Sequence, residues 1–289
     1  MKTLWLIVLS AVCLFWSCSD KSKDLFYVDI VNPLDGGVGI KMLAISGGTF
    51  QMGSKLRPPF YTVLNIVTGE LDTIYNRERP VHPVTLDPFK ISTTEITQEQ
   101  YKTVMGVNPA NFQIGEYNLP VEKVSWEEAV TFCNKLSNLT GLDPCYNLET
   151  WECDFTSNGF RLPTEAEWEY AYRAGLNLEY IIGNDTRNLD RAAWSVSNSS
   201  LVTHPIATKD PNNAGLYDMA GNVWEWCYDY FGYYHCNSEV NPIGPSMGYY
   251  RVQRGGSWAS TADDCRAAAR KTGDPKLGST TAGFRVARR

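Results

Sequence analysis

Two carboxylates in the segment GLYDMAGNVWEW, residues 215–226, have types and spacing that indicate a metal chemistry. Asp218 and Glu225 supply hard oxygen atoms, which calcium prefers over nitrogen or sulfur. Gly221 and Asn222 between them are small residues that allow a tight turn. The segment therefore favours a calcium site. The alternative is that Glu225 only hydrogen-bonds the loop while the two tryptophans fill the core.

Other catalytic templates find little support in the sequence. The three histidines, His82, His204 and His235, show no HExxH spacing, which argues against a zinc hydrolase or an iron site. A GxGxxG phosphate-binding loop does not occur. The net charge of −6 and the scattered basic residues argue against general nucleic-acid binding, because phosphate contacts need clustered Lys and Arg.

The N-terminus has the pattern of a targeting element. Lys2 supplies a positive charge, and Leu4–Trp16 is an apolar run that is shorter than the roughly twenty residues a membrane-spanning helix needs. The small residue Ser17 followed by Cys18 resembles a bacterial lipobox, in which the cysteine thiol is lipidated. An ordinary cleaved signal peptide is the alternative.

The domain organisation is predicted to be simple. The chain of 289 residues is 43% hydrophobic and 20% charged, as is usual for a folded globular domain, and no linker or repeat divides it. We expect a signal peptide (1–17), a lipidated Cys18 with a polar tether (18–39) and one folded domain (40–289). Such a protein would be an outer-membrane lipoprotein of the bacterial envelope, facing the periplasm or the surface. It would bind a protein, peptide or glycan, not nucleic acid.

Six cysteines follow the predicted lipidation site, which suits an oxidising compartment. Cys145 and Cys153 bracket a short loop that a disulfide can close, with a stabilisation of about 2–3 kcal/mol in the chain-entropy model. Cys133 and Cys227 lie in apolar patterns and are predicted to be buried thiols, while the state of Cys236 stays open.

Three helices are predicted from capping boxes, in which a Ser or Thr is followed three residues later by Gln or Glu. The pairs are Thr97 with Gln100, Ser125 with Glu128, and Thr164 with Glu167. Helical spacing places a few residues on inward faces: Ala129, Phe132, Cys133 and Leu136 in the second helix, Trp168 and Ala171 in the third.

The remaining segments predict strands and loops. Residues 42–54 alternate apolar and small residues and predict a β-hairpin strand that opens the fold. Residues 55–81 form a long irregular segment. Beyond Gly175, many Gly, Asn, Pro and aromatic residues predict short strands and ordered loops.

Five segments with distinctive sequences lie in the predicted domain: RLPTEAEWEYA (161–171), GLYDMAGNVWEW (215–226), RGGSW (254–258), CRAAAR (265–270) and GFR (283–285). In this order they resemble the formylglycine-generating enzyme family, also called sulfatase-modifying factors. The resemblance covers roughly residues 41–288. It implies an irregular α+β single domain related to the C-type lectin fold.

The resemblance also implies metal ligands. In the family, the segment at 215–226 binds a structural calcium ion. Carried over, its ligands are the backbone oxygens of Asp218, Gly221 and Val223 and the carboxylate of Glu225.

The catalytic members of the family hold copper between two cysteine thiolates and use oxygen to oxidise a substrate cysteine to formylglycine. Here Ser260 stands where the first cysteine belongs, and Cys265 is in register with neither. A hydroxyl is a poor ligand for Cu(I), so copper and the oxidase chemistry are not expected. Ser257, Ser260 and Cys265 mark the family's active-site region without a confident catalytic residue.

Aromatic residues crowd two segments that the family brings together around its substrate groove, and large rings suit peptide or sugar recognition. The alternative is that they fill a loop-rich core. The predicted ligand groove consists of Tyr233, Tyr234, Trp258, Ala259 and Ser260. We therefore expect a non-catalytic binding or structural module. The alternatives are a formylglycine-generating oxidase and a lectin-like variable protein that binds ligands through residues 259–264.

Overall fold

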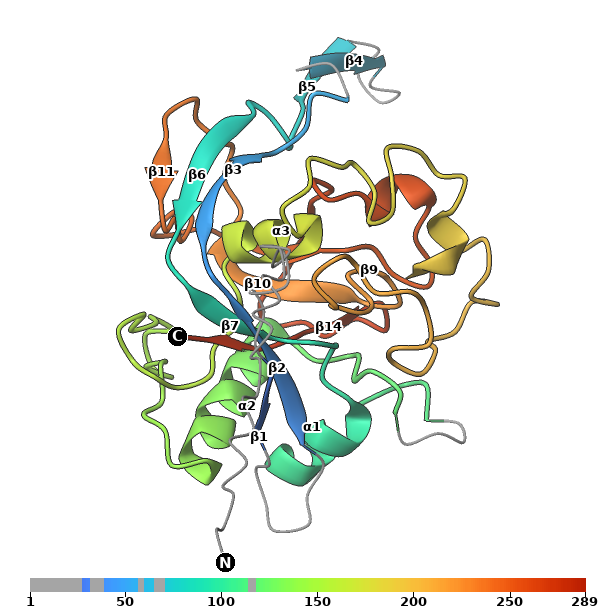
Figure 1. Cartoon of the computed structure of the whole chain (residues 1–289). Helices are drawn as coiled ribbons and strands as arrows, with labels where there is room; N and C mark the ends of the chain where they lie inside the picture. The colour runs from blue at the N-terminus through green and yellow to red at the C-terminus, as the bar shows by residue number, and fades with distance from the viewer. Residues whose placement is uncertain (1–27, 32–38, 57–59, 65–70, 114–117) are drawn as a thin grey trace, which may run out of the picture.

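The computed structural model describes residues 28–31, 39–56, 60–64, 71–113 and 118–289. The predicted signal peptide, Cys18 and most of the tether lie outside the described residues. Within them, no helix has the length and apolar character needed to cross a membrane. The described part contains three α-helices and short strands in mixed sheets, which confirms the predicted α+β class (Figure 1).

Strand β10 (Trp224–Tyr230) lies between two hydrophobic cores. Successive side chains of a strand point to opposite faces, so Trp226 packs into one core and Cys227 into the other. The helices α1 (Gln98–Met105) and α2 (Trp126–Leu139) contribute to the Trp226 core, and α3 (Glu165–Arg173) to the Cys227 core (Figure 1). The sheet around β10 has the order β13 (Lys271–Gly273), β12 (Arg251–Arg254), β10, β14 (Ala282–Gly283).

A second four-stranded sheet joins segments from the two ends of the described chain. Its order is β1 (Val28–Val31), β2 (Ile40–Ile45), β7 (Phe89–Ser92), β15 (Ala287–Arg288). A three-stranded sheet has the order β11 (Glu239–Val240), β6 (His82–Leu86), β3 (Gly48–Met52).

The hairpin strand predicted at 42–54 is divided into two strands, β2 and β3, which belong to different sheets. Strand β2 pairs with β1 and β7, whereas β3 pairs with β6. Gly47 has a φ of +73°, and a Cβ there would lie 2.7 Å from the backbone of Asp87. Because glycine has no Cβ, the chain can pass close to Asp87 here and turn from the sheet that contains β2 into the sheet that contains β3.

The remaining elements are short, as predicted for the chain beyond Gly175. Two parallel strands, β8 (Ala193–Trp194) and β9 (Ala220–Gly221), pair with each other. The 3₁₀-helices are η1 (Leu189–Arg191) and η2 (Ala262–Cys265). The predicted irregular segment 55–81 contains an antiparallel pair, β4 (Phe60–Leu64) and β5 (Leu71–Tyr75).

All three predicted helices begin with the expected reciprocal cap. In each, the Ser or Thr side chain accepts a hydrogen bond from the backbone N–H three residues later. The Gln or Glu side chain at that later position accepts a hydrogen bond from the backbone N–H of the Ser or Thr. The predicted inward faces are confirmed, since all six residues are buried: Ala129, Phe132, Cys133, Leu136, Trp168 and Ala171.

Candidate functional site

The loop after β12 contains two serines where the resemblance places copper chemistry. The hydroxyl oxygens of Ser257 and Ser260 lie 3.1 Å apart and share a hydrogen bond, and both residues are buried. The backbone N–H of Ser260 donates to the Ser257 carbonyl, which makes the loop a tight turn. Two neutral hydroxyls are hard, weak metal ligands, so they cannot take the place of two thiolates in binding Cu(I).

Cys265 does not supply a thiolate to this loop. Its side chain is buried, and burial raises the pKa of the thiol to about 12. A Cβ added at Gly256 would lie only 2.7 Å from the Cys265 sulfur, so the thiol packs directly against the backbone of the glycine turn. A thiol with this pKa stays protonated at neutral pH, and the residues present here do not fit the copper site of the family.

The carboxylate of Glu225, predicted as a calcium ligand, has protein partners for both oxygens. Arg285 donates to its two oxygens at 2.6 and 2.7 Å, and the indole N–H of Trp168 donates at 2.6 Å. Glu225 is fully buried. The structure therefore places this carboxylate in an ion pair with Arg285, on the α3 side of β10.

Two further buried carboxyl groups lie near this ion pair. Burial raises the pKa of Glu95 well above its usual range, and the charges of Asp218 and Glu225 add to the effect. Burial likewise raises the pKa of Asp218 to about 6. Glu225, Glu95 and Asp218 thus all interact electrostatically with the guanidinium of Arg285. Three acidic groups act on one basic group, a surplus that a cation would relieve. Among the described residues, however, no three His, Cys, Asp or Glu side chains are arranged to hold a metal ion. The calcium site stays a prediction that depends on backbone oxygens.

The cysteines of the predicted disulfide are adjacent but present as free thiols. A hydrogen bond from the Cys153 thiol is the main cause that lowers the pKa of Cys145 to about 7. The backbone brings them together, because Tyr146 and Cys153 form an antiparallel bridge. The disulfide itself stays a prediction. Cys133 and Cys227 are buried thiols, as predicted, and Cys236 is exposed.

The residues of the predicted ligand groove lie in two different places. Tyr233 and Tyr234 line a pocket beside the start of α3, which Trp258, Ala259 and Ser260 do not line. The Trp258 ring instead packs edge-on against Phe112 and donates to the carbonyl of Thr280. Trp224 and Trp226 are buried in the core, whereas Tyr249 and Tyr250 are 90% and 54% exposed.

Residues 244–248 read GPSMG and match the spacing of the GxSxG serine-nucleophile motif. That motif works only where the serine sits on a sharp turn between a strand and a helix. Ser246 is exposed in the loop between β11 and β12, which are both strands. The match therefore does not indicate a nucleophile.

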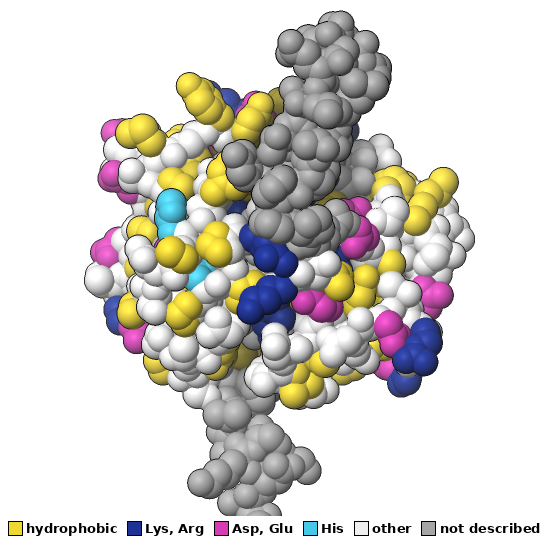
Figure 2. Space-filling model, turned by 90° about the horizontal axis from the view of Figure 1, so that it is seen from above, with side chains coloured by type: hydrophobic (Ala, Val, Ile, Leu, Met, Phe, Trp, Pro, Cys, Tyr) yellow, Lys and Arg dark blue, Asp and Glu magenta, His cyan; other side chains and the backbone are white. Residues whose placement is uncertain are grey.

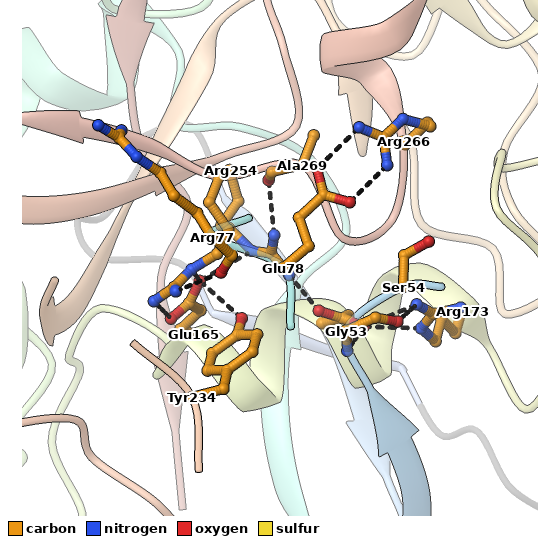
Figure 3. Close-up of polar contacts among 12 residues, drawn as sticks. Gly53, Ser54, Arg77, Glu78, Glu165, Arg173, Tyr234, Arg254, Arg266 and Ala269 are labelled. Atoms are coloured by element: carbon orange, nitrogen blue, oxygen red, sulfur yellow. Dashed lines mark hydrogen bonds and ion pairs between the residues drawn. The ribbon is translucent and has the colours of Figure 1, made fainter. Parts of the chain in front are cut away.

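A buried network of ion pairs links α3 to the C-terminal segment. Glu169 accepts from Arg173 at 2.7 Å and pairs with Arg254, and Arg254 also approaches Glu165 at 3.5 Å. Figure 3 shows this network, with Glu78 extending both oxygens toward Arg266 at 2.7 Å each. Removing one member would leave a buried charge without its partner, so the network holds these segments in register.

The pocket lined by Tyr233 and Tyr234 has a volume of about 490 Å³. Glu165 begins α3 at its base and accepts two hydrogen bonds from Arg270 at 2.6 Å each. Asp229, near the end of β10, is 4% exposed, and one of its oxygens accepts from the Glu165 N–H at 2.7 Å. Desolvation raises the pKa of Asp229 to about 8, and the charge of Glu165 adds to the shift.

None of the three charged residues at the base of this pocket was predicted as a site residue. Glu165 and Arg270 belong to family-like segments that the sequence places far apart. Asp229 carried a usable signal, since it is one of only two carboxylates, with Glu225, inside the aromatic run WEWCYDYFGYY of residues 224–234. A buried acidic residue in such a run needs a specific partner or a function.

Comparison with known families and proteins agrees with this fold. Residues 37–289 match the sulfatase-modifying factor enzyme 1-like domain. The chaperone protein LppX of Paenibacillus barcinonensis is 33% identical over 214 residues, which cover 62% of this chain and 72% of LppX. The formylglycine-generating enzyme of Streptomyces coelicolor is 36% identical over 190 residues, 60% of this chain. The chain spans only 54% of that enzyme and 38% of the chlamydial serine/threonine-protein kinases named pkn1 that it matches.

Among solved structures, the variable protein 1 of Treponema denticola has the same fold with a TM-score of 0.79. It is 34% identical, and the alignment covers 92% of this chain and 99% of that protein. The similarity therefore extends over the whole described domain.

Proposed function

The chain belongs to the family of sulfatase-modifying factor enzyme 1-like domains, and on that premise we propose that it is a binding module without the copper oxidase activity of the formylglycine-generating enzymes. The observation that supports this most is the hydroxyl pair of Ser257 and Ser260, 3.1 Å apart, in the loop where a thiolate pair would be needed. The buried Cys265 thiol, with a pKa of about 12, adds no second soft donor.

A copper titration tests this proposal. The purified full chain is titrated with Cu(I) and then incubated with oxygen and a peptide that carries the cysteine-x-proline-x-arginine motif. We expect no tight two-thiolate copper complex and no formylglycine. The variant Cys265→Ser should behave as the wild type, because the buried thiol takes no part. Formylglycine formed over many turnovers would show that the chain is an oxidase.

A second candidate function, a variable ligand-binding protein, is favoured by the similarity to the Treponema variable protein. In this case residues 259–264 form the contact surface, and exposed side chains such as Thr261 lie at its edge. Comparison of close strains tests it. Substitutions concentrated at 259–264 over an unchanged scaffold would support this function, and evenly distributed substitutions would count against it.

The envelope location is part of the proposal and depends on Cys18. Metabolic labelling with a radioactive fatty acid should label the wild-type chain and not Cys18→Ala. Fractionation should recover the labelled protein with the outer membrane. Secretion of an unlabelled wild-type chain would instead indicate an ordinary cleaved signal peptide.

A structural calcium ion, held by Asp218, Gly221, Val223 and Glu225, is likewise a proposal. The surplus of buried carboxyl groups around Arg285 supports it, while the pairing of Glu225 with Arg285 would have to loosen on binding. Calcium that binds only the folded state raises its stability by mass action. The melting temperature should therefore rise with added calcium and fall with a calcium chelator, with magnesium as the control.

A further inference from the structure

The pocket beside the start of α3 has the volume and lining of a small-molecule site. Its volume of about 490 Å³ lies within the range of ligand pockets, roughly 300–1,000 Å³. Aromatic and proline side chains form its walls, and carboxyl groups lie at its base and side. We propose that this pocket binds a small organic cation, such as a quaternary ammonium or a guanidinium compound.

The walls supply the surfaces on which such a cation is stabilised. Tyr230, Tyr233 and Tyr234 line the pocket together with His82 and His235. Aromatic faces attract ammonium and guanidinium groups when water is excluded. The fold already uses this contact, because the Arg270 guanidinium lies 4.1 Å from the centre of the Tyr234 ring. On the face seen in Figure 2, histidine side chains lie among hydrophobic ones.

The charges that line the pocket favour a cation. Among the described residues, neither Asp229 nor Glu239 forms an ion pair, and both line the pocket. Asp229 is almost fully buried, and a Cβ added at Gly244 would lie 3.1 Å from its second oxygen, so the backbone of Gly244 packs closely against this carboxylate. Beside the hydrogen bond from the Glu165 N–H, a bound cation would give this carboxylate a directly paired charge, which the described residues do not supply.

The same residues disfavour an anion. Arg270 is the one Lys or Arg side chain among the described residues that line the pocket. Its guanidinium donates to both oxygens of Glu165 and to the carbonyls of Arg77 and Gly232. The N-terminus of α3 would otherwise attract an anion, but Thr164 caps it and its Glu165 N–H already donates to Asp229.

This proposal names the ligand class of the binding module proposed above and rests on that function. The two proposals can nevertheless be tested separately, because copper binding and formylglycine formation are measured without any ligand in the pocket. The Ser257 and Ser260 loop does not line this pocket, so a result at one site leaves the other unchanged.

Calorimetric titration of the full chain with choline tests the proposal. The neutral compound 3,3-dimethylbutan-1-ol has the same shape without the charge, and a methyl glucoside tests for sugar binding. We expect choline to bind at least about tenfold more tightly than the neutral alcohol. Asp229→Asn keeps an oxygen that accepts from the Glu165 N–H, so it should fold and yet lose about tenfold in choline affinity. Asp274→Asn makes the same change on an exposed turn and should bind as the wild type.

The pH dependence separates Asp229 from the other groups that face the pocket. These are Glu165, Glu239, His82, His235 and Arg270, with the three tyrosines. Choline keeps its charge at every pH, and it requires ionised Asp229. Its affinity should therefore rise between about pH 7 and pH 9 in the wild type and stay constant in Asp229→Asn.

Three results would overturn the proposal. The first is no binding of choline or of the guanidinium compound agmatine at millimolar concentration and about pH 9. The second is equal affinity for choline and its neutral analogue. The third is binding of the methyl glucoside in preference to either cation, which would make the pocket a sugar site. Circular dichroism of Asp229→Asn shows whether lost binding reflects lost folding.

Discussion

At the scale of single residues, the environment of Asp229 differs strongly from water. It is 4% exposed at the end of an aromatic strand and lies against Glu165, a second buried carboxylate. Its hydrogen bond from the Glu165 N–H anchors the start of α3. The buried charge costs free energy when it forms, so this residue couples the stability of the fold to pH.

We predict that Asp229→Asn stabilises the protein at alkaline pH. The pKa of Asp229 is about 8 in the folded state and about 4 when unfolded. The folded state then binds more protons between these values, so wild-type stability falls as pH rises from about 4 to 8. The neutral amide in the Asp229→Asn variant carries no charge, so the variant does not lose stability in this way. Its advantage in urea denaturation should grow between about pH 5 and pH 9 by an amount on the order of 1–5 kcal/mol. An advantage that is the same at both pH values would contradict the assignment.

A second residue-scale prediction concerns Cys145 and Cys153. The pKa of the Cys145 thiol, about 7, gives a thiolate at neutral pH that can react with its neighbour under oxidising conditions. Mass spectrometry of a non-reduced digest should find the two linked. Cys145→Ser should cost about 2–3 kcal/mol relative to the oxidised wild type. Cys236→Ser, at an exposed thiol, should leave stability unchanged. Two free thiols in protein purified without a reductant would be the contrary result.

At the scale of elements, the helices are locally determined and the strands are not. Each helix start is specified by two residues three positions apart, and all three were correct. The prediction of one hairpin strand at 42–54 missed its division into two strands in different sheets, because the partners of a strand lie elsewhere in the chain. Alternation shows which side chains are buried, but not which strand lies beside them.

The cap of α2 offers a measurable test of this local control. The Ser125 hydroxyl accepts a hydrogen bond from the Glu128 N–H at 3.2 Å, and the Glu128 carboxylate accepts one from the Ser125 N–H at 2.8 Å. Ser125→Ala should lower the free energy of unfolding by about 1 kcal/mol. Thr131→Ala in the same helix is the control, since alanine favours a helix interior and should change stability by less than about 0.5 kcal/mol. Equal losses in the two variants would argue against the cap.

At the scale of the whole molecule, the C-terminal segment closes the fold. Strand β15 pairs with β7 in the sheet that also holds β1 and β2, and Arg161 forms two backbone hydrogen bonds with Ala287. Val286 and Ala287 are fully buried. The two cores therefore depend on contacts between the first and last parts of the domain.

Truncation measures this closure. Removing residues 286–289 deletes a buried valine and the backbone bonds of β15, and should cost about 3 kcal/mol or more in denaturant unfolding. Removing Arg289 alone, which is exposed, should have little effect. If both truncations unfold at the denaturant concentration of the full chain, the ends do not contribute to the stability of the domain.

The sequence by itself determined the family, the α+β class, the three helix starts and the inward faces of the helices. These properties depend on short motifs and on local periodicity, which neighbouring residues specify. Together with the family resemblance, it also predicts that Ser260 stands where a copper ligand belongs, because the chain itself shows which positions hold a sulfur atom. Only the tertiary structure decided that Glu225 pairs with Arg285, that Tyr234 and Trp258 occupy different sites, and that a pocket forms around Asp229. At the base of this pocket, Asp229 and Arg270 each form a hydrogen bond with Glu165, and only the packing of α3 against β10 and the C-terminal segment makes these contacts possible.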